Sequence, residues 1–269
     1  MNIKSFILKN KRLAIGGSIT AIMVILAVTG LFFTPYDPNA MDISAKLSGI
    51  SPRHIMGCDN FGRDIFSRVL AGLSTTMVVA VGTVFIGIVF GTLIGAFTGY
   101  YGGYLDEIMM RFNDAVLAFP SLLLALVFIS VMGSGKLNVT IALGILFIPS
   151  YARIMRGEFL KCRNLDYVMS ARLMGASDMR IMFVHILPNT VRVMLSTIAI
   201  GFNNAVLAEA GMSYLGIGVQ PPDASLGRML SEAQSYLFVR PGYAVCTGMA
   251  IVLLILGFSM LSEGLEKNA

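Results

Sequence analysis

Long apolar stretches separated by shorter polar segments recur along the whole chain. Each run is about 20 residues long, which is the length that an α-helix needs to cross ~30 Å of hydrocarbon. The expected spans are residues 13–33, 74–98, 112–132, 138–156, 190–210 and 243–262. The pattern predicts an all-α fold, a polytopic bundle of about six transmembrane helices that forms a single domain over residues 1–269.

The first apolar run follows a basic N-terminus, which is also typical of a signal peptide. Residues 13–33 carry no charge and are preceded by Lys9, Lys11 and Arg12. The run is longer than the ~7–15-residue core of a signal peptide, and no small-residue cleavage site follows it. We interpret it as an uncleaved first helix.

Basic residues gather between the fourth and fifth spans and at the N-terminus. The interhelical group consists of Arg153, Arg156, Lys161, Arg163, Arg172 and Arg180. Because cytoplasmic loops of membrane proteins are enriched in Lys and Arg, this distribution predicts that both chain ends lie on the cytoplasmic side.

Composition agrees with a membrane protein and argues against a soluble one. The chain is 56% hydrophobic and only 13% charged, whereas a soluble domain has about a quarter of its residues charged. The net charge of +5 is explained by the enrichment of Lys and Arg in cytoplasmic loops, because the basic residues flank apolar spans. Nucleic acid is therefore not an expected partner. Three distant cysteines and two histidines indicate no metal site.

The second span carries a glycine at every fourth position. These residues are Gly87, Gly91, Gly95 and Gly99. In a lipid environment, a stripe of small residues lets a second helix approach closely. The stripe predicts tight helix packing and indicates nothing about a substrate.

A loop over residues 157–189 predicts two short helices on the cytoplasmic face. Leu165, Val168, Met169 and Leu173 recur at helical spacing on one face of the first. Gly175 ends that helix, because glycine readily adopts the left-handed conformation found past a helix C-terminus. Ser177 caps a second helix whose apolar side holds Met179, Met182, Phe183 and Ile186, and Pro188 marks the step into the fifth span. The pattern fits either a hairpin resting on lipid or an element docked into a groove on a partner.

This loop resembles the EAA loop of permease subunits of bacterial ABC importers. The family pattern is E-A-A-x3-G, followed nine residues later by I-x-L-P. Ala171, Gly175, Leu187 and Pro188 match at the correct spacing, whereas Met169 stands at the position of the glutamate and His185 at that of the isoleucine. The His-Ile-Leu-Pro form is similar to the dipeptide, oligopeptide and nickel permeases.

Two further stretches resemble the same group. Residues 57–68, GCDNFGRDIFSR, are similar to its G-T-D-x-x-G-R-D-x-x-S-R stretch, and residues 209–222 to E-A-x-x-S-F-L-G-x-G-V-Q-P-P. The resemblance implies a type I ABC importer transmembrane domain whose cytoplasmic loop couples to an ATPase. The coupling residues so implied are Asp166, Ala171, Arg172, Gly175, Ala176, Ser177, Asp178, Arg180 and Pro188.

The chain has no credible nucleotide site or catalytic cluster of its own. Residues 133–137, GSGKL, lack the first glycine and the final Ser/Thr of a phosphate-binding loop. The expectation is a transport subunit that binds no cofactor, with ATP and Mg²⁺ bound by partner chains. The resemblance implies a second homologous permease subunit, two ATPase subunits and an extracellular or periplasmic substrate-binding protein.

Three polar residues in or near the fifth span are candidates for the translocation path. Asn203 and Asn204 lie deep in the span, and Glu209 lies near its outer end. Polar groups inside a bilayer usually face protein or water. In one interpretation all three line the path. In the other, the asparagines join helices and Glu209 lies at the level of the lipid headgroups.

The function that the resemblance implies is import across the bacterial cytoplasmic membrane. The group carries dipeptides, oligopeptides, or nickel and metal chelates. Peptides are the expected substrate and nickel is the alternative. A self-sufficient channel or secondary transporter is the alternative of a different class, which predicts repeated halves or ionisable residues stacked in mid-membrane.

Overall fold

The computed structural model describes residues 11–266, and the fold that it shows is a helical bundle. The elements are α2 (Lys11–Phe32), a 3-10 turn η1 (Ile43–Ala45), α3 (Ile65–Tyr101), α4 (Gly103–Leu117), α5 (Ser121–Met132), α6 (Lys136–Cys162), α7 (Asp166–Leu173), α8 (Asp178–Arg180), the π-helix η2 (Ile181–Ile186), α9 (Leu187–Tyr214), α10 (Leu226–Gln234) and α11 (Pro241–Glu266). The all-α membrane fold expected from the sequence is thereby confirmed.

Five helices of the described chain are long and apolar enough to cross a membrane, and a bent pair makes a sixth crossing if its two helices form one span. The pair is α4 and α5, whose axes meet at 90°. The span expected over residues 112–132 is therefore divided, because it takes in the end of α4, the bend and α5. Pro120 lies at the bend, and proline both lacks an N–H donor and keeps the preceding residue out of the helical conformation.

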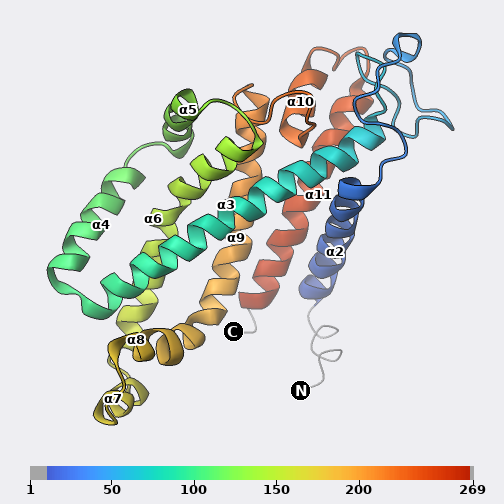
Figure 1. The fold of residues 1–269 in the computed structure, drawn as a ribbon. Helices are drawn as coiled ribbons and strands as arrows, with labels where there is room; N and C mark the ends of the chain where they lie inside the picture. Colours follow the sequence, from blue (N-terminus) through green and yellow to red (C-terminus); the bar gives the residue numbers. More distant parts are fainter. Residues whose placement is uncertain (1–10, 267–269) are drawn as a thin grey trace.

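The ends of the helices fall into two groups (Figure 1). The beginning of α2 and the end of α11 lie toward the same end of the bundle as α7 and α8, at the bottom of the view. The loop between α2 and α3 lies at the opposite end together with α10. This arrangement matches a chain whose two termini and basic loop share the cytoplasmic side.

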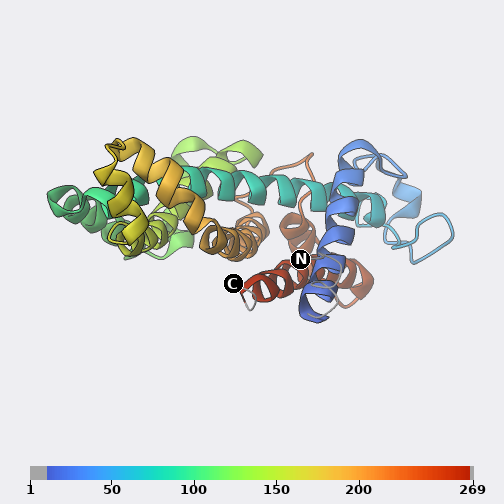
Figure 2. The same cartoon turned by 90° about the horizontal axis from the view of Figure 1, so that it is seen from below.

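The bundle has two pairs of closely packed helices. Seen from below, α2 and α11 lie beside each other on one side of α3, whereas α6 lies along α3 over much of its length (Figure 2). Gly16 lets α2 approach α11 closely, because a Cβ at that position would lie 2.6 Å from the Cβ of Met260. Small residues thus set the distance between these helices.

The glycine stripe of α3 faces α6. A Cβ built on Gly91 would lie 2.5 Å from the Cβ of Tyr151, and one on Gly95 would lie 2.6 Å from the carbonyl oxygen of Ala152. Gly87 and Gly99 approach α6 as closely, with distances of 2.8 and 2.6 Å to its nearest atoms. Any side chain on this stripe would force the two backbones apart.

The helix α3 is longer than the expected span of residues 74–98. Its 37 residues would extend about 55 Å at 1.5 Å per residue, well beyond the ~30 Å hydrocarbon core. It begins on the outer side, where the Asp64 carboxylate accepts a hydrogen bond from the Ser67 backbone N–H at 2.7 Å and caps the helix. Its last turn reaches the cytoplasmic loop, so one rigid element joins the two ends of the bundle.

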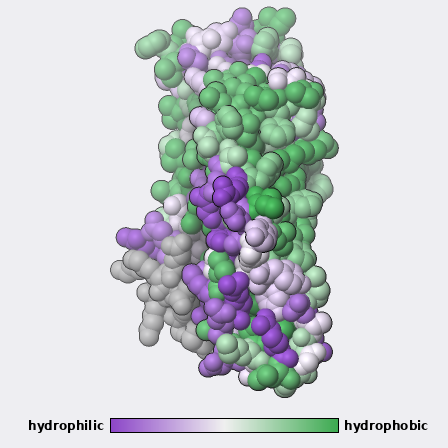
Figure 3. Space-filling model, turned by 90° about the vertical axis from the view of Figure 1, so that its left-hand side faces the viewer, coloured by the Kyte–Doolittle hydropathy of each residue, from purple (hydrophilic) through white to green (hydrophobic). Residues whose placement is uncertain are grey.

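The surface on the side of α4 and α5 is apolar in its upper part, and hydrophilic side chains gather in its centre and lower part (Figure 3). Charged residues of α4 are paired on this side of the molecule. Arg111 bonds Glu107 at 2.6 Å, and Asp114 forms an ion pair with Arg153 of α6. Pairing lowers the cost of placing these charges at the edge of the bilayer.

Candidate coupling site and solute cavity

The short helix α7 projects from the cytoplasmic end of the bundle. It ends near Gly175, which has a φ of 81°, the left-handed conformation that the sequence predicts after a helix. The Ala176 N–H donates to the Ala171 carbonyl at 3.0 Å, which closes the turn. The chain then reverses direction into α8.

The second short helix expected before the fifth span is not a separate element. Residues 178–214 run as one continuous helical stretch through α8, η2 and α9. Pro188 lies inside this stretch, directly after the π-helix η2, and the helix continues through it, so the proline marks no step between two helices. Ser177 lies at the N-cap position, but its side chain makes no capping hydrogen bond. That expected cap is therefore wrong.

The apolar face expected for α7 is divided between two surroundings. Val168 is fully buried and Ala171 is 3% exposed, whereas Leu173 is 89% and Met174 81% exposed. Leu165 and Met169 are also exposed. Only the sector of α7 that rests on the bundle is covered, so the rest of its apolar side faces away from the chain.

An apolar cluster fixes the buried sector of α7 to two long helices and to η2. It contains residues of α3, α6, α7 and η2: Ala96, Tyr100, Met155, Phe159, Val168, Ala171, Ile181, Met182 and Ile186. Of the apolar residues expected on the second short helix, Met182 and Ile186 are buried here, whereas Met179 is exposed. The buried sector of α7 is thus packed against α3, α6 and η2.

The hydroxyl of Tyr100 links α3 to both sides of the turn after α7. Arg172 Nη2 donates a hydrogen bond to Tyr100 Oη at 3.0 Å, and Tyr100 Oη donates to Asp178 Oδ1 at 2.6 Å. The Arg172 guanidinium also lies 5.7 Å from the centre of the tyrosine ring. The bond to Tyr100 raises the pKa of the Arg172 guanidinium above its ordinary value. We call Arg172, Tyr100 and Asp178 the coupling triad.

The remaining residues expected in the coupling loop lie around this turn. Asp166, Ser177, Arg180 and Pro188 are exposed, and Ala176 is half-buried. Sequence reasoning did not identify Tyr100, because a tyrosine at the end of an apolar run is also typical of a membrane interface. The only signal was its place at the inner end of α3.

A cavity of about 620 Å³ lies between α6, α9 and the bend between α4 and α5. Of the three expected path residues, Asn204 lines this cavity, whereas Asn203 and Glu209 do not. Asn203 is half-buried, and its Oδ1 has no hydrogen-bond partner among the described residues. The two neighbouring asparagines thus differ in their surroundings: Asn204 lines the cavity and Asn203 does not.

Glu209 is fully buried near the outer end of α9. Its carboxyl group accepts hydrogen bonds from Thr76 at 2.8 Å and Ser213 at 2.6 Å. The Leu226 N–H also donates to the Thr76 hydroxyl at 3.3 Å, which ties α10 to the same group. In this structure Glu209 joins α3, α9 and α10.

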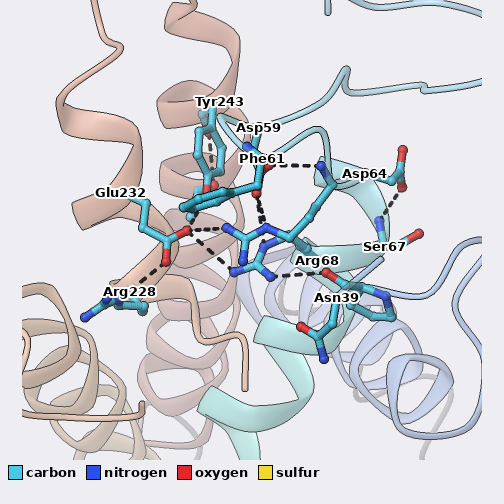
Figure 4. A network of polar contacts seen from close by, with 12 residues as sticks. Asn39, Asp59, Phe61, Asp64, Ser67, Arg68, Arg228, Glu232 and Tyr243 are labelled. Atoms are coloured by element: carbon cyan, nitrogen blue, oxygen red, sulfur yellow. Dashed lines mark hydrogen bonds and ion pairs between the residues drawn. The ribbon is translucent and has the colours of Figure 1, made fainter. Parts of the chain in front are cut away.

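A buried ion cluster joins the two outer loops (Figure 4). Arg63 Nε donates to Asp59 Oδ2 at 2.6 Å and Arg63 Nη2 donates to Glu232 Oε2 at 2.9 Å. Arg68 lies 3.6 Å from each of these carboxylates, and the Tyr243 hydroxyl donates to Glu232 at 3.2 Å. Residues 57–68 thus contact Glu232 of α10, which lies 169 positions beyond Arg63, and Glu232 in turn is bonded by Tyr243 of α11.

Comparison with known proteins identifies the family. The family described as "Binding-protein-dependent transport system inner membrane component" matches residues 87–268, more than half of the chain. The chain belongs to this family. It is a multi-pass component of the inner membrane and the permease subunit of an ABC importer, which acts with the importer's other components and is not itself an enzyme. Membership argues against a self-sufficient channel or secondary transporter.

Individual relatives support the family assignment. The chain is 38% identical over 251 residues to the glutathione transport system permease protein GsiD of Pectobacterium atrosepticum, covering 93% of this chain and 83% of the relative. It is 40% identical over 246 residues to the GsiD protein of an Escherichia coli strain (O6:K15:H31), covering 91% and 81%. The fold is similar to that of the MetNI methionine ABC transporter in an inward-facing conformation, with a TM-score of 0.60, 18% identity and coverage of 75% and 94%.

Proposed function

We propose that this permease is one of two homologous membrane subunits that form the path for peptide-like solutes, and that α7 docks into a groove on an ATPase subunit. The proposed assembly contains two ATPase subunits, which bind ATP and Mg²⁺, and a substrate-binding protein outside the membrane. The observation that carries the docking proposal is the exposure of Leu173 and Met174 on a helix whose opposite face is locked onto the bundle.

The position of α7 favours a protein partner over a lipid surface. Figure 1 places α7 at the extreme lower end of the molecule, beyond the beginning of α2 and the end of α11. A helix resting on lipid would lie level with those ends and turn its apolar side toward the bilayer. Here the covered side faces the bundle, and Leu173 points away from it. A short helix with exposed apolar anchors fits a groove on another protein.

Movement of a docked α7 would reach the spans by two connections. The coupling triad joins it to the inner end of α3. The continuous stretch over residues 178–214 joins it to α9. Because these contacts are short and packed, displacement of α7 by an ATPase subunit would shift α3 and also α9, which lines the cavity.

The test of docking is site-directed cross-linking in the assembled importer. The native cysteines are first replaced by serine, and Leu173→Cys is treated with a short bifunctional reagent. We expect a product with the mass of the permease plus one ATPase subunit. Leu137→Cys is the matched control, because Leu137 is 68% exposed and begins α6 at the other end of the bundle. Equal cross-linking of both variants, or none at Leu173→Cys, would refute the docking proposal.

The substrate proposal rests on the GsiD relatives, whose name states glutathione transport. Uptake of labelled glutathione, a dipeptide and Ni²⁺ is measured in cells that carry the complete importer and in cells that lack this permease. We expect permease-dependent uptake of glutathione or the dipeptide. Permease-dependent uptake of Ni²⁺ alone would contradict the peptide-like substrate and support the nickel alternative.

A further inference from the structure

The cavity between α6, α9 and the α4–α5 bend has a neutral wall. Besides apolar residues, the wall includes Ser121, Ser150, Thr197 and Asn204. None of its lining residues, all of them within the described part of the chain, carries a charge. We propose that this wall is the surface through which the permease contacts its solute inside the membrane, by neutral hydrogen bonds to the amide groups of a peptide-like molecule. The inference rests on the proposed function.

The polar side chains of the wall have few partners within the chain. Ser121, Ser150 and Asn204 are exposed, and no hydrogen bond joins their side chains to another residue of the described chain. Thr197 is half-buried, and its hydroxyl donates to the Val193 carbonyl at 2.7 Å, which leaves its oxygen available as an acceptor. Because hydrocarbon cannot satisfy such groups, they indicate that the wall meets water or a polar solute and not lipid.

These four residues, called the strip below, line the cavity from α5, α6 and α9. Thr197 and Asn204 are seven residues apart in α9 and so lie on the same face of that helix. Ser150 faces the same cavity from α6, and Ser121 begins α5 just after the bend. The volume of about 620 Å³ falls within the range of roughly 300–1,000 Å³ typical of small-molecule sites.

The chemistry of the strip selects the class of contact. A carboxamide has both a donor and an acceptor group, and a hydroxyl has both as well, so Asn204 and the serines match the N–H and C=O groups of a peptide backbone. A charged wall would hold or repel solutes according to their charge. A neutral wall lets peptides of either charge pass, and discrimination by charge would then occur outside this cavity.

The first test is the accessibility of a cysteine at position 204 of the strip. In the assembled importer in proteoliposomes, with Cys58, Cys162 and Cys246 replaced by serine, N204C is treated with a hydrophilic methanethiosulfonate reagent. We expect rapid reaction that is slowed by saturating alanyl-alanine together with the binding protein. The matched control is N203C, whose native residue is adjacent but lies outside the wall. Failure of N204C to react would show that lipid or a partner helix covers this face, and would overturn the proposal.

The second test measures selectivity by charge. Uptake of three peptides of equal length, carrying Glu, Ala or Lys, is compared in N204D, N204K and the native permease. We expect N204D to lower the Glu-to-Lys uptake ratio by at least about fivefold and N204K to raise it, because one added charge interacts with a solute at close range. Equal changes for all three peptides would contradict solute contact at Asn204.

The two tests separate this inference from the proposed function. If the native permease takes up no peptide, the proposed function fails. If peptide uptake is normal and the charge of residue 204 leaves the Glu-to-Lys ratio unchanged, only the solute-contact inference fails. The labelling experiment needs no transport and decides the exposure of the wall in either case.

Discussion

Substitution of Tyr100 by phenylalanine isolates the contribution of one hydroxyl group to coupling. The hydroxyl accepts from Arg172 on one side of the α7 turn and donates to Asp178 on the other. Phenylalanine keeps the ring, which lies in the apolar cluster with Val168 and Ala171. The variant therefore removes the polar half of the connection between α7 and α3 and leaves the packing in place.

The expected magnitude follows from the two bonds. A hydrogen bond to a charged group contributes about 1.5–3 kcal/mol, and exposed ion contacts contribute about 0–1 kcal/mol. Arg172 and Asp178 are both largely exposed, and without the hydroxyl they are free to bind water or each other. We therefore expect the attachment of α7 to weaken by about 1–2 kcal/mol, a factor of roughly 5–30 in the opening equilibrium.

Hydrogen exchange of the assembled importer measures this opening directly. The backbone amides of residues 166–176 are expected to exchange about 5–30-fold faster in Tyr100→Phe, with more ATP hydrolysed per solute transported. Tyr101→Phe is the matched control, because Tyr101 is the adjacent residue and its hydroxyl makes no hydrogen bond within the described chain. If both variants exchange alike, the triad does not hold α7 and the reasoning is refuted.

Three further predictions concern the turn, the helix contact and the outer cluster. A proline in Gly175→Pro cannot adopt a φ of 81°, so this variant should abolish uptake without preventing membrane insertion. Transport assays and the amount of permease in the membrane measure the two effects, and unchanged uptake would count against the docking role. Gly91→Ala should lower the thermal unfolding temperature much more than Gly211→Ala, because a Cβ at Gly211 meets no atom within 4 Å; similar shifts would contradict the α3–α6 contact. Glu232→Ala should destabilise the permease by about 3–5 kcal/mol in thermal unfolding, because two buried guanidinium groups lose a carboxylate partner. The double variant Glu232→Ala/Arg63→Met should regain part of this lost stability.

The hydrophobic pattern was sufficient to predict the membrane fold, because apolar runs of about 20 residues have few structural alternatives. The hydrophobic pattern did not predict the bend within residues 112–132, because apolar content alone does not register the effect of Pro120 on a helix. The charges of Asp106 and Asp114 and the proline together mark an amphipathic helix that ends at a bend. These signals are local and were present in the sequence.

The polar contacts at the cytoplasmic and outer ends of the bundle could not be predicted in the same way. Tyr100 meets Asp178 across 78 positions of sequence, and Arg63 meets Glu232 across 169. A single sequence contains no signal that pairs such residues, because their proximity results from how the long helices pack. Gly175 was more accessible to prediction, since a helix end followed by glycine is a local feature. Which of Asn203 and Asn204 lines the cavity likewise depends on how α9 is rotated about its axis, and not on its composition.

We propose that an ATPase subunit binds the exposed end of α7. The most direct measurement is the amount of ATPase that copurifies with a permease carrying both Leu173→Asp and Met174→Asp, compared with Leu137→Asp. Both sites are exposed, so the folded bundle should tolerate each change. We predict that the double variant inserts in the membrane but loses most of its bound ATPase, whereas the control retains it. Retention of the native amount of ATPase by the double variant would contradict the claim.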